Sequence, residues 1–89
     1  MRAIISVFGK DKVGIMCCVS EVCSKYGANI IDVNQTIIED YFAMFMIVNI
    51  DNLNIDFIDF VDKMSEVGNQ KGLKIHVMHE EIFDMMHKI

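Results

Sequence analysis

The chain has 89 residues, 53% of them hydrophobic, with a formal net charge of −5. This length allows one domain with a thin core, because so small a domain buries only about 60–65% of the surface that its unfolded chain exposes. The acidic charge and the single arginine, Arg2, exclude a binder of nucleic acid or of a membrane surface, since both need clustered basic side chains. The hydrophobic excess fits either apolar surface covered by a partner or a core rich in Met and Ile.

The first part of the chain predicts a strand, a loop and a helix. Residues 2–8 alternate between two faces that are both mostly apolar, which is typical of a central strand. Apolar residues at helical spacing then continue to about Tyr26, and Gly27 suits the left-handed position just after a helix. Asp11 is the predicted N-cap, because its carboxylate can accept hydrogen bonds from the free amides of the first turn.

Two further strands are predicted around a turn at Glu39 and Asp40. The turn contains neither glycine nor asparagine, the residues that tight two-residue hairpins prefer, so its geometry stays open. Residues 41–50 are apolar on both faces and therefore need cover on both. Residues 29–38 place Ile31, Val33 and Ile37 on one face, and a polar row of Asp32, Asn34 and Thr36 on the other. This polar row fits a solvated face, an extended polar site or a polar contact.

The second half predicts a helix, an edge strand and a terminal helix. The apolar stripe from Phe57 to Val67 indicates a helix that ends at Gly68. Residues 73–78 alternate as on a half-exposed edge strand. Residues 80–89 form a helical pattern whose acidic start suits the helix dipole.

The order βαββαβ predicts an α+β fold, a ferredoxin-like sandwich with a four-stranded antiparallel sheet and a short C-terminal helix. We expect one domain over residues 1–79 and a C-terminal helical extension over residues 80–89. Right-handed crossovers place both long helices on one face of the sheet. The C-terminal helix or a second subunit is therefore expected to cover the other face.

The loop from Gly9 to Gly14 is the most informative segment for function. It joins a strand to a helix N-terminus, where free backbone amides and the helix dipole attract anions such as a carboxylate. The two glycines permit a tight turn and the close approach of a ligand, and Lys10, Asp11 and Lys12 add charges of both signs. The same residues also fit an ordinary capped loop with solvated lysines.

Two segments resemble the motifs of a known family. Residues 4–15, Ile-Ile-Ser-Val-Phe-Gly-Lys-Asp-Lys-Val-Gly-Ile, resemble the opening motif of ACT domains. Residues 27–32, Gly-Ala-Asn-Ile-Ile-Asp, resemble the entry to the second strand of those domains. The resemblance covers Met1 to about His79. It is strongest to the small stand-alone ACT proteins, and next to the glycine-cleavage regulator group.

The resemblance implies a regulatory domain without a cofactor, which pairs with a second copy and binds an amino acid or a similar small effector at the interface. The implied ligand-binding residues are Gly9, Lys10, Asp11, Lys12, Val13, Gly14, Ile15, Asn29 and Ile30. Asn29 would come from the facing subunit, where its amide can donate to a carboxylate and accept from an ammonium group. Asp11 departs from the family, because many members that bind amino acids have a neutral amide there. A carboxylate repels a ligand carboxylate unless Lys10 or Lys12 compensates.

Other kinds of site find less support. The three cysteines (Cys17, Cys18 and Cys23) form no CxxC pair, which favours reduced thiols that act as small apolar residues. His76 and His79 lie three residues apart in a strand and so point to opposite faces, which disfavours a zinc site. An enzyme of the acylphosphatase type would need an arginine in the first loop, and none is present. Phe8, Phe42 and Phe45 imitate the stacking residues of RNA-binding domains, but the acidic charge disfavours that function.

We therefore expect a cytoplasmic, non-enzymatic regulatory domain that forms a homodimer and binds a small effector. No metal, nucleic-acid or membrane partner is expected, and the longest apolar run, Tyr41 to Val48, is far shorter than the about 20 residues that span a bilayer. A regulated protein partner is left open. The alternative is a protein-interaction module without a working ligand site, whose contact is the C-terminal helix with Met85 and Met86.

Overall fold

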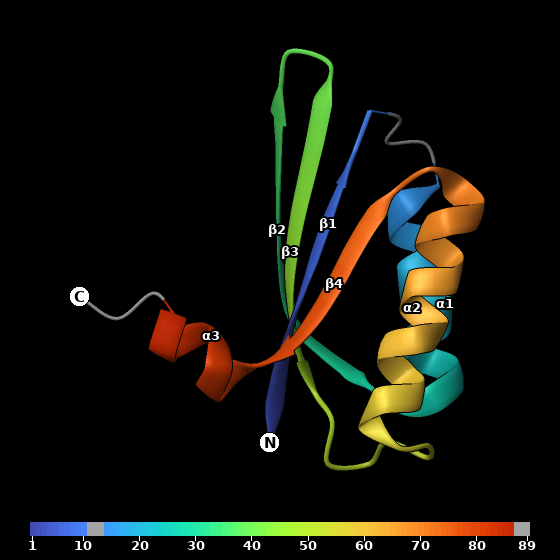
Figure 1. Cartoon of the computed structure of the whole chain (residues 1–89), viewed down its shortest axis with the longest axis vertical. Coiled ribbons are helices and arrows are strands. Elements are labelled where there is room, and N and C mark those ends of the chain that lie inside the picture. The colour runs from blue at the N-terminus through green and yellow to red at the C-terminus, as the bar shows by residue number, and fades with distance from the viewer. Residues whose placement is uncertain (11–13, 87–89) are drawn as a thin grey trace.

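A four-stranded antiparallel sheet carries two long helices on one face, in a computed structural model that describes residues 1–10 and 14–86 (Figure 1). The elements in chain order are β1 (Arg2–Gly9), α1 (Ile15–Tyr26), β2 (Asn29–Ile38), β3 (Tyr41–Asn49), α2 (Phe57–Lys71), β4 (Lys74–His79) and α3 (Glu80–Met86). The strand order is β2-β3-β1-β4. This order confirms the predicted ferredoxin-like α+β fold, with β1 central, β4 at an edge and a short helix at the C-terminal end.

The core lies between the sheet and the two long helices. Alternate residues of the central strands face it and have no exposed surface: Ala3, Ile5 and Val7 of β1, and Met44, Met46 and Val48 of β3. The helices contribute Val19 and Cys23 from α1, and Phe60 and Met64 from α2. The period of two in the strands and the helical spacing in α1 and α2 thus meet in one apolar layer, as the sequence predicts.

Strand β2 pairs with β3 through an irregularity between Ile30 and Asp32. Ile31 is skipped by the ladder and is exposed, as is usual for the extra residue of a β-bulge. This bulge breaks the regular alternation that was predicted for the strand. Beyond it, the polar row Asp32, Asn34 and Thr36 stands opposite Ile47, Phe45 and Ala43. The row therefore lies on the sheet face that points away from α1 and α2, which we call the open face.

The predicted end of the second helix at Gly68 is wrong, because α2 continues to Lys71 and Gly72 takes the left-handed cap position with φ 71°. Gly68 serves a different purpose. A Cβ atom there would lie 2.9 Å from the backbone oxygen of Leu73 and 3.2 Å from Cγ1 of Ile75. The missing side chain therefore lets α2 approach β4 closely. Strand β4 also begins and ends one residue later than predicted.

Helix α3 lies on the side of the sheet opposite to α1 and α2 (Figure 1), where it contacts β1 and β4. This agrees with the expectation that the C-terminal helix covers the open face, but the cover is partial. Phe8, Ile38, Tyr41 and Phe45 stay exposed. Residues 87–89 of the predicted terminal helix lie outside the described residues. Within the part of the chain that the structure describes, no helix is long and apolar enough to cross a membrane.

Candidate functional site

The junction between β1 and α1 is the centre of the predicted site. Gly9 ends β1, Gly14 takes the N-cap position of α1 with φ 75°, and Ile15 begins the helix as a buried residue. Asp11, Lys12 and Val13, three of the predicted site residues, lie outside the described residues. The predicted cap by Asp11 is thus not described, and the structure places Gly14 directly before the helix.

The two glycines of this junction have different surroundings. A Cβ atom on Gly9 would lie 2.4 Å from Cδ2 of Leu73, so the end of β1 passes close to the start of β4. A Cβ atom on Gly14 would meet nothing within 4 Å among the described residues beyond its chain neighbours, although its positive φ disfavours any side chain there. As far as the structure describes it, the junction is therefore packed at Gly9, and no described residue crowds Gly14.

The first turn of α1 can attract an anion. The amides at the start of an α-helix have no partner inside the helix, and their dipole favours negative charge. The N–H of Cys18 donates to the carbonyl of Gly14 at 3.0 Å, and this bond begins the regular helical pattern. No side chain of the described residues caps the preceding amides, and no acidic residue lies in the first turn. Lys10 adds a cation at this end, with Nζ 5.6 Å from the centre of the Tyr41 ring.

Asn29 and Ile30 lie at the other end of the sheet. Asn29 stands opposite Asn49 of β3, whereas Gly9 stands opposite Phe42. Seven positions of β3 separate these two levels (49 − 42), which is about 23 Å at the rise of a strand. The structure therefore does not bring Asn29 close to Gly9 within one chain.

A cavity of about 450 Å³ surrounds the start of β2. It is lined by Ser20, Cys23, Ser24, Gly27, Ala28, Asn29 and Ile30. Two of the predicted site residues thus border an open space of their own, beside the C-terminal half of α1. Because this space is lined by two hydroxyls and one amide, it can contribute hydrogen bonds but no formal charge.

The histidines behave as the spacing predicts. His79 stacks on the ring of Phe57 in α2, with centroids 3.9 Å apart, whereas His76 borders a cavity on the open face. The two imidazoles therefore lie on opposite faces of β4. Among residues 1–10 and 14–86, no group of three or more His, Cys, Asp and Glu side chains is placed to hold a metal ion.

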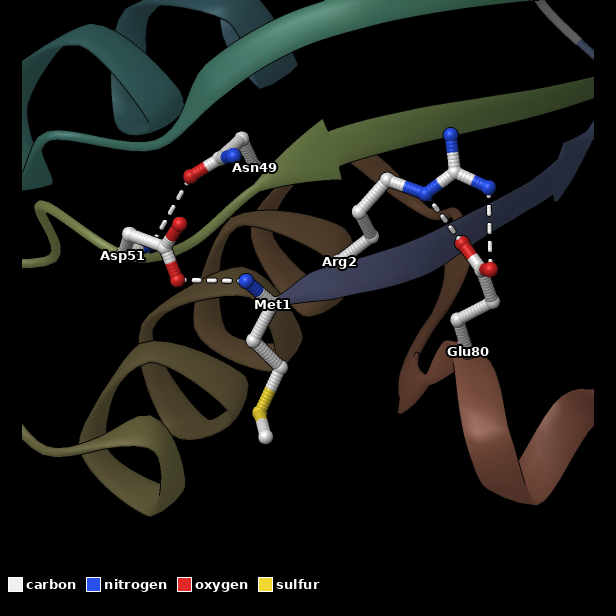
Figure 2. A network of polar contacts seen from close by, with 5 residues as sticks. All are labelled: Met1, Arg2, Asn49, Asp51 and Glu80. Carbon is white, nitrogen blue, oxygen red and sulfur yellow. Dashed lines mark hydrogen bonds and ion pairs between the residues drawn. The ribbon is translucent and has the colours of Figure 1, made fainter.

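An ionic network at the start of β1 was not among the features predicted from the sequence (Figure 2). The Arg2 guanidinium binds both carboxylate oxygens of Glu80, with Nη2 2.9 Å from Oε1, and the N-terminal ammonium of Met1 binds Asp51. The backbone N–H of Asp51 also donates to the side-chain oxygen of Asn49 at 2.8 Å. The partners are far apart in the sequence and form no motif, so only the fold could reveal them.

The network lowers the pKa of both carboxyl groups. The hydrogen bond from Arg2 lowers the pKa of Glu80, and the hydrogen bond from the N-terminal ammonium lowers the pKa of Asp51. A cavity of about 640 Å³ lies beside the network and is lined by Met1, Arg2, His79, Glu80, Glu81 and Ile82. Since the charges of Met1 and Arg2 are paired with carboxylates, the network joins chain segments, and we do not assign it to the effector.

Comparison with known proteins places this geometry in context. Residues 2–78 match the family model of the ACT domain. A UPF0237 protein of Methanocaldococcus jannaschii is 40% identical over 88 residues, which cover 99% of this chain and 98% of that relative. The solved structure of an ACT domain protein from Streptococcus pneumoniae is 37% identical and superposes with a TM-score of 0.83. The match covers 94% of this chain and 94% of that one. A protein assigned as a glycine cleavage system transcriptional repressor shares the fold at 24% identity and a TM-score of 0.67, over 85% of this chain and 43% of that one.

Proposed function

Because the chain belongs to the ACT domain family, among the UPF0237 proteins, we propose that it is a regulatory domain that binds an amino acid or a similar small effector between two copies of itself. In this proposal the first loop of one copy, Gly9 to Ile15, binds the carboxylate of the effector. Asn29 and Ile30 of the other copy complete the site. The bound effector would then change the geometry of the dimer and signal to another protein.

One observation carries this proposal: Gly9 and Asn29, which belong to different halves of the proposed site, lie at opposite ends of the sheet, about 23 Å apart along β3. A single chain cannot use both halves for one small molecule. A two-fold axis perpendicular to the sheet reverses the strand direction in the second copy. It therefore brings the end of the sheet that carries Gly9 in one copy beside the end that carries Asn29 in the other. The separation of Gly9 from Asn29 excludes a shared site within one chain, and the same separation suits a site formed between two copies.

Strand β2 is the edge at which such a pairing fits. It spans ten residues at one border of the sheet, so its outer backbone groups are open to another strand. Antiparallel pairing of two β2 strands would continue the sheet through the dimer. It would also place the N-terminus of α1, which packs against β2, near the start of β2 in the partner.

Calorimetry against the twenty amino acids tests the proposal, with saturable heat expected for at least one of them at millimolar concentration. Gly14→Asn adds a side chain at the junction in a residue type that tolerates positive φ, and Asn29→Ala removes the amide. Each variant alone should lose the heat of binding. No heat from the unaltered protein with any amino acid would contradict this choice of effector.

Mixing the two variants gives the sharper test. When Gly14→Asn and Asn29→Ala chains are unfolded together and refolded, each mixed dimer carries one site with both halves intact. Binding should therefore return in the mixture, although neither variant binds alone. A site inside one chain would regain nothing, so failure of this complementation contradicts an effector site shared between copies.

The alternative, a protein-interaction module, is favoured by one observation on α3. Met85 and Met86 are 77% and 65% exposed, and methionine suits adaptable contact surfaces. Under this alternative, Met85→Glu abolishes the action on a partner protein, whereas Gly14→Asn and Asn29→Ala leave it unchanged. Removal of residues 80–89 separates the two functions as well, because effector binding at the first loop should survive it.

A further inference from the structure

The open face of the sheet has a cavity of its own, which the proposed effector site does not use. It measures about 360 Å³ and lies between α3 and strands β1, β3 and β4. Phe8, Phe45, Met78 and Phe83 supply apolar walls, and Ser6 and His76 supply the polar groups. The space is therefore bounded by the sheet on one side and by α3 on the other.

Two aromatic rings shape one wall of this cavity. Phe8 and Phe45 pack edge to face, with centroids 5.8 Å apart and an angle of 85° between the rings. Both rings remain about two-fifths exposed, at 42% and 41%. Exposed ring faces and edges attract a further aromatic ring in stacked or edge-to-face arrangements.

The polar groups of the cavity lie next to each other. Ser6 and His76 stand directly opposite in the antiparallel pair of β1 and β4, so their Cβ atoms are about 4.5–5.5 Å apart on the same face. A hydroxyl and an imidazole can each donate one hydrogen bond. Ser6 also stands opposite Phe45, which places the polar pair at the edge of the aromatic wall.

We propose that this cavity binds a small aromatic molecule with one hydrogen-bond acceptor, of the class of aryl carboxylates and phenols. Its ring would lie between Phe45 and Phe83, and its acceptor would face Ser6 and His76. An apolar pocket with a few convergent polar groups is the usual form of a small-molecule site, and 360 Å³ is at the small end of the range for such sites. Lys74 stands opposite Phe8 on the same face, where it adds a cation that favours a carboxylate.

Titration with phenylacetate, followed by amide NMR shifts, tests this proposal on the full chain. Phenylacetate should shift the amides of Ser6, Phe45 and His76 in a saturable way, whereas acetate, which has no ring, should not. Ser6→Ala and His76→Ala should each weaken the affinity by roughly two- to tenfold, as expected for one lost hydrogen bond. Thr36→Ala changes the same face outside the cavity and should leave the affinity unchanged.

Phe83→Ala removes the wall that α3 contributes and should weaken phenylacetate more than Phe83→Leu does. Three results would overturn the proposal: no saturable shift at millimolar phenylacetate, an equal response to acetate, or equal affinity in Phe83→Ala and the unaltered chain. The outcome is independent of the proposed effector, because amino acids at the first site would instead shift the amides of Gly14 and Asn29.

Discussion

Glu39 has a backbone conformation that suits glycine better than any other residue. It lies in the hairpin between β2 and β3 with φ 55°, a left-handed conformation that costs an L-residue about 1–2 kcal/mol. Glu39→Gly should therefore raise the free energy of unfolding by about 0.5–1 kcal/mol, since part of the relief is lost to the greater entropy of the unfolded chain. Urea denaturation followed by circular dichroism measures this difference.

Asp40→Gly is the matched control for this substitution. Asp40 lies in the same turn, but among the described residues other than glycine only Glu39 has positive φ. Asp40→Gly should therefore lower the stability or leave it unchanged. If both substitutions shift the midpoint in the same direction by the same amount, the strain at Glu39 is not the cause.

The hairpin also shows which features of a single residue can be predicted from the sequence. The position of the turn at Glu39 and Asp40 was predicted correctly, because these two charged residues separate two segments with the alternation of strands. Its backbone geometry was not, because φ at Glu39 is fixed by the register of the two strands that it joins. Pairing of Ile38 with Tyr41 leaves only two residues to reverse the chain. The neighbouring residue types do not predict the positive φ that Glu39 adopts as a result.

The cysteines should differ sharply in reactivity. Cys23 is buried in the core, and desolvation raises the pKa of its thiol to about 11, which suppresses the reactive thiolate. Cys17 is exposed on the same helix. Iodoacetamide near the ordinary thiol pKa of about 8.5 should therefore modify Cys17 at once, and Cys23 only after unfolding. Mass spectrometry of the digested protein measures both rates, and equal rates in the folded protein would refute the buried position of Cys23.

Helix α3 depends on contacts outside itself. It has seven residues, and isolated helices shorter than about 12 residues are marginal in water. Its first residue, Glu80, is held by Arg2 of β1 (Figure 2). Phe83 borders the cavity on the open face. The order of α3 should therefore follow the state of the Arg2–Glu80 pair.

Acid should release α3 before the rest of the fold. The pair lowers the pKa of Glu80, so its stabilising contribution is complete above the ordinary glutamate value of about 4.3 and is lost as the pH falls below it through the lowered pKa. Hydrogen exchange should show faster opening of α3 amides in this range, and Glu80→Gln should cause the same opening at neutral pH. Glu81→Gln is the control on the same helix. Equal opening in both variants would show that the Arg2 pair does not hold α3.

Helix α2 illustrates what the spacing of apolar residues can and cannot predict for an element. The apolar stripe identified the helix and its buried face correctly, since both follow from helical spacing. The end was misplaced because Gly68 and Gly72 have the same residue type and different functions. Gly68 admits the backbone of Leu73, whereas Gly72 adopts positive φ. Gly68 is distinguished from Gly72 only by its contact with Leu73 and Ile75, and this tertiary contact cannot be read from the helical pattern.

At the scale of the whole molecule, the order of elements predicted the sheet, but not how the site residues are distributed over it. The βαββαβ order and the right-handed crossovers leave few topologies, so β2-β3-β1-β4 follows from the strand pattern. The separation of Gly9 from Asn29 follows from the antiparallel direction of β1 and β3 and from the lengths of the strands. The ionic network of Arg2 has no sequence signal, because Glu80 is 78 residues away.

The proposed dimer makes a prediction about the edge of the sheet. Ile31 and Ile37 of β2 are 47% and 55% exposed, although both are large apolar residues. Lysines at both positions should stop two β2 strands from pairing, because charged side chains block an edge and like charges repel across a pair. Sedimentation equilibrium should therefore show two chains per particle for the unaltered protein, and one for the variant Ile31→Lys with Ile37→Lys.

A control for this experiment lies on the other side of the fold. Ile58 is 74% exposed on α2, so Ile58→Lys adds the same kind of charge away from β2 and should leave the dimer intact. Circular dichroism should show the same fold in all three proteins, which separates dissociation from unfolding. If the unaltered protein is monomeric at effector concentrations that saturate its binding site, each chain must bind the effector alone. The distance between Gly9 and Asn29 would then exclude a shared site, and the proposed mechanism would fail with it.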